Sequence, residues 1–389
     1  MAKAQLVRGR HQRILSGHPW IYSNEIQEVS GQADPGDIID VVDSRGKFVG
    51  RGYINPQSQI AVRLLTRAEE DIDRAFFAGR LRRAVEYRQR VVPGASAFRV
   101  VHTEADFLPG LIVDKFSDYL VVQTLTLGID RWKDTIAEIL DELLSPKGIY
   151  ERNDAPVREL EGLEQKVGFI KGPFGTLVDI DENGVSVTVD VQRGQKTGYF
   201  LDQTENRLAI RRYCKDARVL DCFCYSGGFA LSAARGGARE VAGVDQAESA
   251  MDLARANAIR NAFGACSFEQ ANAFDYLRLL HRRSERFDVV ILDPPAFAKS
   301  KSALEGAVRG YKEINLRAMK ILEPRGILIS CSCSHHMDEA LFFQVILEAS
   351  VDVGRTLRLI EKRGQAKDHP VLAAAPETGY LKCFIFEVS

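Results

Sequence analysis

The residues best suited to chemistry lie at the ends of strand-like segments in the second half of the chain. An apolar run at 219–223 is followed by a Ser-Gly-Gly turn at 226–228 and then by a helix-like segment. A strand, a glycine turn and a helix open a nucleotide-binding α/β unit, because glycines let the backbone approach a ligand closely. The next strand-like run, 240–245, ends in Asp245, whose carboxylate can accept hydrogen bonds from both hydroxyls of a ribose. The glycines alone would fit an ordinary turn, but this acid favours a ligand site.

The same turn argues against NAD as the ligand. A dinucleotide needs the pattern G-x-G-x-x-G to seat its pyrophosphate on a helix N-terminus. This turn has one adjacent glycine pair, Gly227 and Gly228, preceded by Asp221. Such a pattern suits a ligand with no phosphate and a charged amino-acid tail. The sequence therefore predicts S-adenosylmethionine, with its adenosine held by Asp245.

Three further strand ends supply polar or reactive side chains to the same crevice. Asn272 follows the third strand and can hydrogen-bond the adenine edge. The fourth strand ends in Asp293-Pro-Pro, whose prolines stiffen the loop, although D-P-P also occurs as a plain strand-ending turn. The fifth strand runs through Cys331 to Cys333. We expect Cys333 to be a nucleophile; the alternative is that both cysteines are small buried core residues.

These side chains must be positioned by a regular α/β domain. Strand-like runs begin near residues 218, 240, 266, 287, 326 and 380, with helical segments between most of them. The alternation predicts a doubly wound, Rossmann-like sheet that binds its ligand at the carboxyl ends of the strands. The last strand, 380–388, follows a long loop, and we expect it to enter the sheet antiparallel.

The first 70 residues have the pattern of a small β-rich domain. Strand-like runs occur at 38–42, 48–53 and 60–65. Arg8, Arg10 and Arg13 lie near Trp20 in the sequence, and cations beside aromatic rings suit RNA binding, since cations meet phosphates and rings stack on bases. The alternative is a solvated basic face with Trp20 in the core.

The middle of the chain predicts a small α+β domain. Residues 70–90 predict a helix that carries six arginines, which form either an RNA-phosphate face or a solvated one: Arg74, Arg80, Arg82, Arg83, Arg88 and Arg90. Strands are expected at 99–102, 110–114, 119–124 and 148–152, with an amphipathic helix at 129–144. A hairpin around Asn183-Gly184 is expected at 177–191.

Charge and cysteine content limit the classes of function. The formal net charge is −1, so no overall field attracts nucleic acid, and an RNA-binding surface must be a local patch. Seven cysteines, all in the second half, argue against a disulfide framework and for a reducing cytoplasm. Two pairs of cysteines have C-x-C spacing, Cys222 with Cys224 and Cys331 with Cys333. A zinc site usually has C-x-x-C spacing, so we expect no metal. We also expect no membrane partner, since no apolar run reaches transmembrane length and no signal peptide opens the chain.

Together the motifs resemble the PUA-domain 23S ribosomal RNA cytosine-C5 methyltransferase family, a group of class I S-adenosylmethionine-dependent enzymes. The resemblance extends from near the N-terminus to D-H-P-V-L at 368–372. The other matching segments are H-P-W-I-Y-S, P-G-D-I-I-D-V-V-D-S-R-G-K, H-T-E-A-D-F-L-P-G-L-I-V-D, G-I-Y-E-R-N-D, G-Q-K-T-G-Y-F-L-D-Q-T-E-N-R, F-C-Y-S-G-G-F, L-D-P-P-A-F and S-C-S-H-H-M.

The resemblance implies three domains and a set of site residues. It implies a PUA RNA-binding domain at 1–70, a central α+β domain with a linking hairpin at 71–180 and a methyltransferase domain at 181–389. By the same resemblance, Cys333 attacks the base. Eight residues are expected to contact the cofactor: Asp221, Tyr225, Gly227, Asp245, Asn272, Asp293, Thr197 and Tyr199. Asp293 also acts in catalysis, and Phe297 contacts RNA. The chain departs from the family at Asn272, where Asp is commoner, and at Thr204, where Arg is usual.

Three functions follow from these observations. The first is formation of 5-methylcytosine in large-subunit ribosomal RNA through a covalent cysteine adduct, with a homodimer as a candidate assembly. The second is methylation of an amino group such as guanine N2, by enzymes that favour [N/D]-P-P-[Y/F/W] with an aromatic ring stacked on the flipped base. Here Ala296 holds that fourth position and the ring follows at Phe297. The third is a catalytically silent RNA-binding protein.

Overall fold

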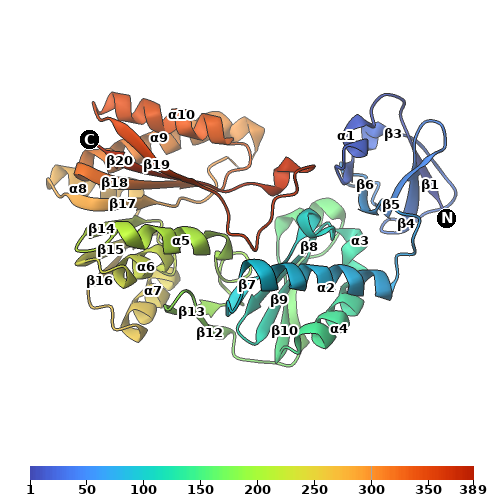
Figure 1. Cartoon of the computed structure of the whole chain (residues 1–389), viewed down its shortest axis with the longest axis horizontal. Helices are drawn as coiled ribbons and strands as arrows, with labels where there is room; N and C mark the ends of the chain where they lie inside the picture. Colours follow the sequence, from blue (N-terminus) through green and yellow to red (C-terminus); the bar gives the residue numbers. More distant parts are fainter. Residues whose placement is uncertain (299) are drawn as a thin grey trace. The chain divides into compact units, whose positions relative to one another are not determined.

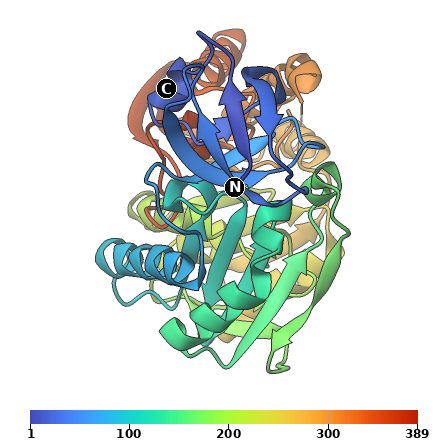
Figure 2. The same cartoon turned by 90° about the vertical axis from the view of Figure 1, so that its right-hand side faces the viewer.

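The computed structural model describes residues 1–298 and 300–389, which divide into two compact units, each with its own sheets and core (Figures 1 and 2). Unit 1 comprises 1–180, 189–201 and 367–378. Unit 2 comprises 181–188, 202–366 and 379–389.

The first sheet of unit 1 has the strand order β2-β6-β5-β4-β1-β3. Neighbours are antiparallel except β1 and β4, which are parallel. Alternation along β4 buries Ile39 and Val41 in the core. The strands expected at 38–42, 48–53 and 60–65 are confirmed, whereas β1, β2 and β3 were not predicted. The elements are β1 (Lys3–Leu6), α1 (Gln12–Leu15), β2 (Trp20–Ile21), β3 (Ile26–Ser30), β4 (Ile38–Val42), β5 (Phe48–Ile54) and β6 (Val62–Thr66).

The second sheet of unit 1 has the order β11-β10-β9-β8-β7, with β9 and β10 parallel. Its strands are β7 (Ala97–His102), β8 (Leu111–Phe116), β9 (Tyr119–Thr124), β10 (Gly148–Asn153) and β11 (Lys166–Lys171). The predicted helix at 70–90 is α2 (Arg74–Val91), and Asp73 caps it by accepting a 2.9 Å hydrogen bond from the Phe76 N–H. The helix expected at 129–144 is interrupted: α3 (Leu127–Asp130) ends before α4 (Lys133–Leu144) begins, and Trp132 at the break packs on Phe77 with ring centroids 4.6 Å apart.

The expected hairpin is present as β12 (Leu177–Asp181) and β13 (Ser186–Asp190). Asn183 and Gly184 both have positive φ, +54° and +78°, as a tight Asn-Gly hairpin turn requires. Glu182 and Val185 close the turn with two backbone hydrogen bonds of 2.8 and 3.1 Å.

Unit 2 is built on one sheet in the order β16-β15-β14-β17-β18-β20-β19. The strands are parallel except β20, which runs antiparallel to both neighbours, as expected for the last strand. The six strands that were predicted are β14 (Arg218–Cys222), β15 (Glu240–Asp245), β16 (Cys266–Gln270), β17 (Phe287–Leu292), β18 (Leu322–Ser332) and β20 (Lys382–Val388). The seventh, β19 (Leu357–Arg363), stands where a long loop was expected; it is a charged, half-exposed edge strand.

Helices cover both faces of this sheet (Figure 1). Consecutive residues of β14 point to opposite faces, so that Val219 packs in the core beneath α6 and Leu220 in the core beneath α8, α9 and α10. The arrangement is the doubly wound α/β fold predicted from the sequence. The helices are α5 (Thr204–Ile210), α6 (Gly228–Arg235), α7 (Glu248–Arg260), α8 (Ala273–Arg282), α9 (Leu304–Ile321) and α10 (Glu339–Asp352).

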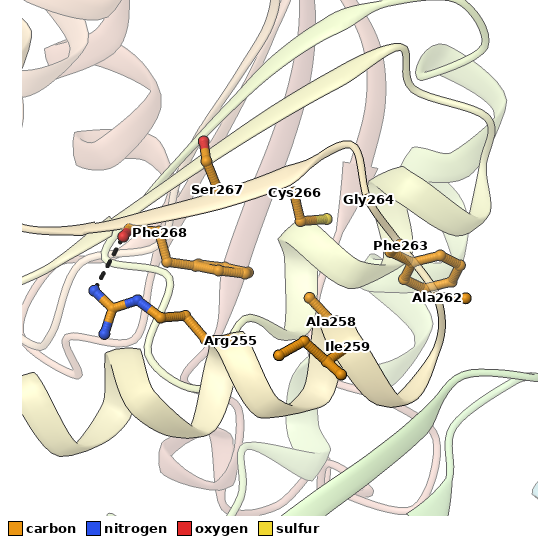
Figure 3. Close-up of a pocket in the computed structure, with 9 residues that line it drawn as sticks. All are labelled: Arg255, Ala258, Ile259, Ala262, Phe263, Gly264, Cys266, Ser267 and Phe268. Atoms are coloured by element: carbon orange, nitrogen blue, oxygen red, sulfur yellow. Dashed lines mark hydrogen bonds between the residues drawn. The ribbon is translucent and has the colours of Figure 1, made fainter.

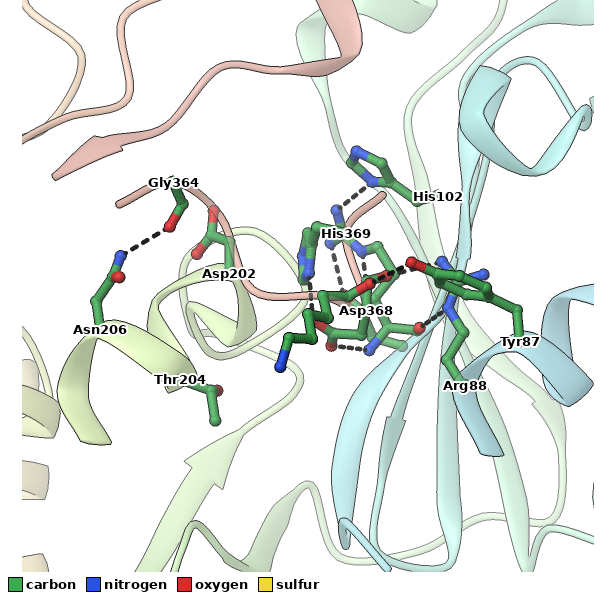
Figure 4. Close-up of polar contacts among 12 residues, drawn as sticks. Tyr87, Arg88, His102, Asp202, Thr204, Asn206, Gly364, Asp368 and His369 are labelled. Atoms are coloured by element: carbon green, nitrogen blue, oxygen red, sulfur yellow. Dashed lines mark hydrogen bonds and ion pairs between the residues drawn. The ribbon is translucent and has the colours of Figure 1, made fainter. Parts of the chain in front are cut away.

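The segment 367–378 joins β19 to β20 in sequence but packs within unit 1 (Figure 4). Asp368 accepts a 2.7 Å hydrogen bond from the Arg99 N–H and pairs with His369 at 2.8 Å. Arg88 donates to the Asp368 carbonyl at 2.7 Å, and the Tyr87 hydroxyl donates to the Lys367 carbonyl at 3.0 Å. The D-H-P-V-L motif is therefore a structural strap of unit 1.

Within the described part of the chain, none of the helices combines the length and the apolar character that crossing a bilayer requires.

Candidate active site

The turn between β14 and α6 is held open by unusual backbone conformations. Phe223 and Tyr225 have positive φ, +64° and +48°, and Gly227, which caps α6, has φ +86°. A Cβ on Gly227 would also lie 3.2 Å from Ala254. Left-handed non-glycine residues cost energy and cluster at functional sites. The turn therefore adopts an unfavourable backbone conformation of the kind that is found in ligand-binding loops.

Three carboxylates gather at the carboxyl ends of neighbouring strands. Asp221 is fully buried; its Oδ2 accepts a 2.8 Å hydrogen bond from the Ala230 N–H, while its Oδ1 is buried without a partner among the described residues. Burial raises the pKa of Asp221 well above its ordinary value, and the charges of Asp293 and Asp245 raise it further. A buried, incompletely paired carboxylate near two others is an arrangement that a cationic ligand would stabilise.

Asp245 and Asn272 are both oriented by backbone N–H groups. Asp245 accepts hydrogen bonds from Tyr225 and Ala247, each 3.0 Å long, so its carboxylate is fixed against the loop. Asn272 caps α8, its Oδ1 accepting from the Phe274 N–H at 2.9 Å. The oxygen of Asn272 therefore has a structural role, which an Asp would fill equally well.

Asp293 follows β17 and is tied to a residue that sequence reasoning did not single out. The Gln203 Nε2 donates to Asp293 Oδ1 at 2.8 Å, and the Asn206 Nδ2 donates to Gln203 Oε1 at 2.7 Å. Both amide side chains are buried. The signal was present in the Q-T-E-N-R segment, where two amides flank the start of a helix, but the sequence could not show which carboxylate they meet.

The two cysteines of β18 differ sharply. Cys331 is fully buried and lies opposite Cys383, and that neighbour together with burial raises the pKa of Cys331 well above its ordinary value. Cys333 follows the last residue of the strand, is partly exposed, and its Sγ lies 3.9 Å from the Pro294 carbonyl of the D-P-P loop. Cys331 is an inert core thiol, whereas Cys333 is accessible beside the loop that carries Asp293.

A buried lysine lies beside Cys333. Lys382 pairs with Ser332 across β18 and β20, and its Nζ donates to the Ser334 carbonyl at 2.7 Å and to the Tyr380 carbonyl at 2.8 Å. The ammonium is thus bonded to the carbonyl of the residue that follows Cys333. Burial lowers the pKa of Lys382 to about 8, although the charge of Cys333 acts in the opposite direction. The sequence signal was a lone cation at the start of a mostly apolar strand.

Phe297 packs into the protein more than was expected for an RNA contact. Its ring lies 4.7 Å from Tyr311 and 6.1 Å from Phe274, centroid to centroid, and it lines a cavity of about 620 Å³ along the first turns of α9. The Tyr311 hydroxyl accepts from the Ser332 hydroxyl at 2.9 Å and lies 3.1 Å from that of Ser334. Phe297 therefore packs against Tyr311, whose hydroxyl contacts the hydroxyl groups of the two serines that flank Cys333.

Two predicted cofactor residues belong to unit 1. Thr197 is fully buried, and its hydroxyl donates to Asp114 Oδ2 at 2.5 Å. Asp114 in turn forms a two-bond ion pair with Arg99 at 2.8 Å. Tyr199 is also buried in unit 1. The structure thus gives Thr197 a structural partner within its own unit.

The arginines expected to bind RNA differ in how accessible they are. Arg8 and Arg10 are exposed, whereas Arg13 is bonded to Glu25 at 2.8 Å. On α2, Arg82, Arg83 and Arg90 are exposed and Arg74 pairs with Glu142 at 2.7 Å. Arg88 is wholly buried, so it belongs to the core rather than to an RNA-binding face.

A second cavity of unit 2 lies away from the carboxylates and from Cys333. It has a volume of about 520 Å³ and is enclosed by α7 and β16, with Ile259, Cys266 and Phe268 among its lining residues (Figure 3). Cys266 begins β16, so the cavity is at the amino end of that strand, opposite the edge where the carboxylates gather.

Across the residues that the structure describes, no cluster of His, Cys, Asp and Glu is arranged to hold a metal ion.

Comparison with protein families matches two segments of the chain. Residues 5–67 match a PUA-like domain, and residues 165–387 match an S-adenosylmethionine-dependent methyltransferase. Curated relatives match over nearly the whole chain. The ribosomal RNA large subunit methyltransferase I of Tolumonas auensis is 42% identical over 384 residues, covering 97% of each chain. The protein of the same name from Escherichia coli O139:H28 is 42% identical over 389 residues, covering 98% of each.

Solved structures show the same fold. A methyltransferase complexed with S-adenosylhomocysteine, SMU.776, superposes with a TM-score of 0.87 at 20% identity over the full length of both chains. A protein described as a SAM-dependent methyltransferase from Streptococcus mutans gives a TM-score of 0.85 at 20% identity, again over both full lengths.

Proposed function

From the premise that the chain belongs to the ribosomal RNA large subunit methyltransferase I family of S-adenosylmethionine-dependent methyltransferases, we propose that it methylates carbon 5 of a cytosine in large-subunit (23S) ribosomal RNA. The observation that carries this proposal is the partly exposed thiol of Cys333, placed beside the Asp293-Pro-Pro loop and a buried ammonium. Carbon-5 methylation needs a nucleophile of this kind, and amino-group methylation does not.

The carboxylate edge of unit 2 fits the cofactor. S-adenosylmethionine carries a sulfonium and an ammonium group, and the buried Oδ1 of Asp221 lacks a described partner in a region made negative by Asp245 and Asp293. We assign Asp221 to the charged amino-acid tail. Asp245 is assigned to the ribose, because its two oxygens are already oriented by the loop.

The thiol of Cys333 has to ionise before it can react. The Lys382 ammonium carries three protons, and two of them are donated to the carbonyls of Ser334 and Tyr380. Its position next to Cys333 favours the thiolate, since an opposite charge nearby stabilises the ionised form. Lys382 is therefore a positioning residue for the nucleophile.

The chemistry assigned to Cys333 follows from the electronic structure of cytosine. Carbon 5 is too poor a nucleophile to attack a methyl sulfonium directly. When the thiolate adds to carbon 6, a C–S bond forms and the ring becomes an enamine whose carbon 5 is nucleophilic. S-adenosylmethionine supplies the electrophilic methyl group. Loss of the carbon-5 proton then expels the thiolate from carbon 6 and restores the aromatic ring, while Asp293, fixed by Gln203, contacts the N3/N4 edge.

Amino-group methylation is the second candidate, and one observation weighs against it. Enzymes of that kind use an aromatic ring after the two prolines to stack on the flipped base. The ring available here, Phe297, is packed on Tyr311 and Phe274.

The test compares the two cysteines of one strand. Cys333→Ala should bind S-adenosylmethionine like the wild type, as measured by calorimetry, and should form no 5-methylcytosine in 23S ribosomal RNA from a deletion strain, as read by bisulfite sequencing. Cys331→Ala is the matched control and should retain methylation, because Cys331 is a core residue.

A trapping experiment separates the candidates further. RNA with 5-fluorocytosine at the target should become covalently linked to the wild type and to Cys331→Ala, but not to Cys333→Ala. Full turnover by Cys333→Ala would place amino-group methylation first. An absence of cofactor binding by the wild type would favour a silent RNA-binding protein.

A further inference from the structure

A small basic cavity lies on unit 1, where α2 meets the loop after β7. Its volume is about 330 Å³, and its lining includes Arg80, Arg83, Tyr87, Phe107 and Pro370. Ligand pockets begin at about 300 Å³, so the cavity is large enough for one base with its phosphate. All of these residues belong to the same unit, so the cavity is a property of that unit alone.

Arg80 is held between two rings at the floor of this cavity. Its guanidinium carbon lies 5.0 Å from the Phe76 ring centroid and 5.3 Å from that of Phe107. Its Nη2 donates to the Leu65 carbonyl at 3.0 Å, while its buried Nε has no hydrogen-bond partner among the described residues. Stacking fixes the guanidinium plane without neutralising its charge.

The charges around the cavity leave it positive. Burial lowers the pKa of Arg80, and the neighbouring charge of Arg83 lowers it further, with Glu70 acting in the opposite direction. The carboxylate that lines the cavity, Asp106, is neutralised by buried Arg88, whose Nη2 donates to Asp106 Oδ2 at 2.8 Å. Two guanidinium groups that repel one another are stabilised by an anion between them.

Phe107 adds a flat surface beside these cations. It is 49% exposed, and its backbone has φ +58°, a conformation that non-glycine residues seldom adopt. One face of its ring is turned to Arg80. The strained loop therefore holds a large aromatic ring partly in water, which hydrophobic burial alone would not favour.

We propose that this cavity binds one nucleotide of single-stranded RNA, with the base stacked on Phe107 and the adjacent phosphate held by Arg80 and Arg83. Aromatic stacking and arginine contacts to phosphate are the two interactions on which single-strand binding is built, and both are present within one cavity. With a net charge of only −1 on the whole chain, RNA affinity must come from local sites of this kind. The identity of the RNA as ribosomal rests on the proposed function.

The test is a binding titration by fluorescence anisotropy, with a labelled single-stranded RNA oligonucleotide and no cofactor. Phe107→Leu should weaken binding by roughly tenfold, whereas Phe107→Tyr should bind like the wild type, because tyrosine keeps the ring. Leucine and phenylalanine share the same backbone strain, so the comparison isolates stacking. Phe169→Ala is the control for an exposed phenylalanine elsewhere in unit 1, since Phe169 is 45% exposed on β11.

The phosphate contact is tested by a pair of adjacent arginines. Arg83→Gln should reduce the slope of log affinity against log salt by about one, whereas Arg82→Gln should leave the slope unchanged, because Arg82 is exposed on α2 but does not line the cavity. RNA carrying 5-iodouracil should photocrosslink to Phe107 in the wild type, with the site located by mass spectrometry.

Three outcomes would overturn the proposal. They are equal losses for Phe107→Leu and Phe107→Tyr, equal salt slopes for the two arginine variants, or strong competition by inorganic phosphate with no effect of Phe107→Leu. Each would leave the methylation chemistry of Cys333 untouched. Conversely, weaker RNA binding by Phe107→Leu but not by Phe107→Tyr, together with a smaller salt slope for Arg83→Gln, would support the site even if Cys333→Ala remained active.

Discussion

Two clusters of ionisable side chains, one from each unit, show different ways in which a protein accommodates such groups. In unit 1, the buried Arg99 and Arg88 are each matched by a carboxylate, Asp114 and Asp106, through two hydrogen bonds. In unit 2, the buried Asp221 and the half-buried Asp245 are bonded to backbone N–H groups instead. Removing one partner of a buried ion pair destabilises the fold, whereas acidic side chains gathered at one edge mark a place where a ligand can complete the balance.

Breaking the paired cluster should have the largest effect. Arg99→Met leaves Asp114 as an uncompensated buried charge, so the free energy of unfolding should fall by about 3–5 kcal/mol. Urea denaturation measures this change. Arg82→Met, at an exposed position, should change it by less than about 0.5 kcal/mol. Equal stabilities for the two variants would show that the pairing in unit 1 contributes nothing.

The unit 2 carboxylates should matter for binding rather than for folding. On the proposed assignment of Asp245 to the ribose, Asp245→Ala would remove charge-assisted hydrogen bonds, each worth about 1.5–3 kcal/mol, and should weaken S-adenosylmethionine binding about tenfold or more. Calorimetry measures the affinity, and Asp252→Ala on the exposed part of α7 is the control. Unchanged affinity in Asp245→Ala would remove Asp245 from the site.

Lys382 sharpens the comparison, because it is a buried cation that is bonded to carbonyls rather than paired like Arg88. With a pKa of about 8, its ammonium is lost as the pH rises above 8, and the stabilisation of the Cys333 thiolate is lost with it. Because rising pH also ionises the thiol itself, the single-turnover rate of methyl transfer should rise with pH, and Lys382→Met, which lacks the ammonium, should need a higher pH than the wild type to reach the same fraction of its maximal rate. Lys382→Arg should keep a profile close to that of the wild type, since arginine stays charged. Identical pH profiles for the wild type and Lys382→Met would exclude this role.

The smallest effect is expected at Asp221. Its pKa is raised from 3.8, so between that value and its folded pKa the folded protein binds a proton that the unfolded chain does not. Stability of the cofactor-free protein should therefore fall as the pH rises through this window. Asp221→Asn should flatten that dependence and raise the melting temperature slightly at neutral pH, while weakening cofactor binding. A lower melting temperature in Asp221→Asn would show that the carboxylate supports the fold.

The parts of the molecule that were predictable are those in which local pattern decides the structure. Apolar runs that end at glycine or aspartate located six of the seven strands of the unit 2 sheet, and with them the strand ends at which Asp221, Asp245 and Asp293 lie. β19 was missed because Leu357–Arg363 has only three apolar residues, without regular alternation, and ends in three charged residues at a sheet edge where burial is weak. Gln203 and Lys382 were missed because Asp293, which Gln203 contacts, and Ser334, which Lys382 contacts, are distant in sequence. Unit 1 residues such as Thr197 could not be assigned for the same reason.

The strap at 367–378 also has a consequence for how the protein can be divided. Because the two units take their residues from alternating stretches, the chain passes between them five times, at 180/181, 188/189, 201/202, 366/367 and 378/379. A fragment that ends at residue 180 lacks the partners of Arg88 and of the Arg99 N–H that Asp368 supplies. Neither unit can therefore be expressed, or released by proteolysis, as one continuous segment of the chain. A single protease cut within the strap would divide a segment of unit 1 and, at the same time, break the connection between β19 and β20 of unit 2.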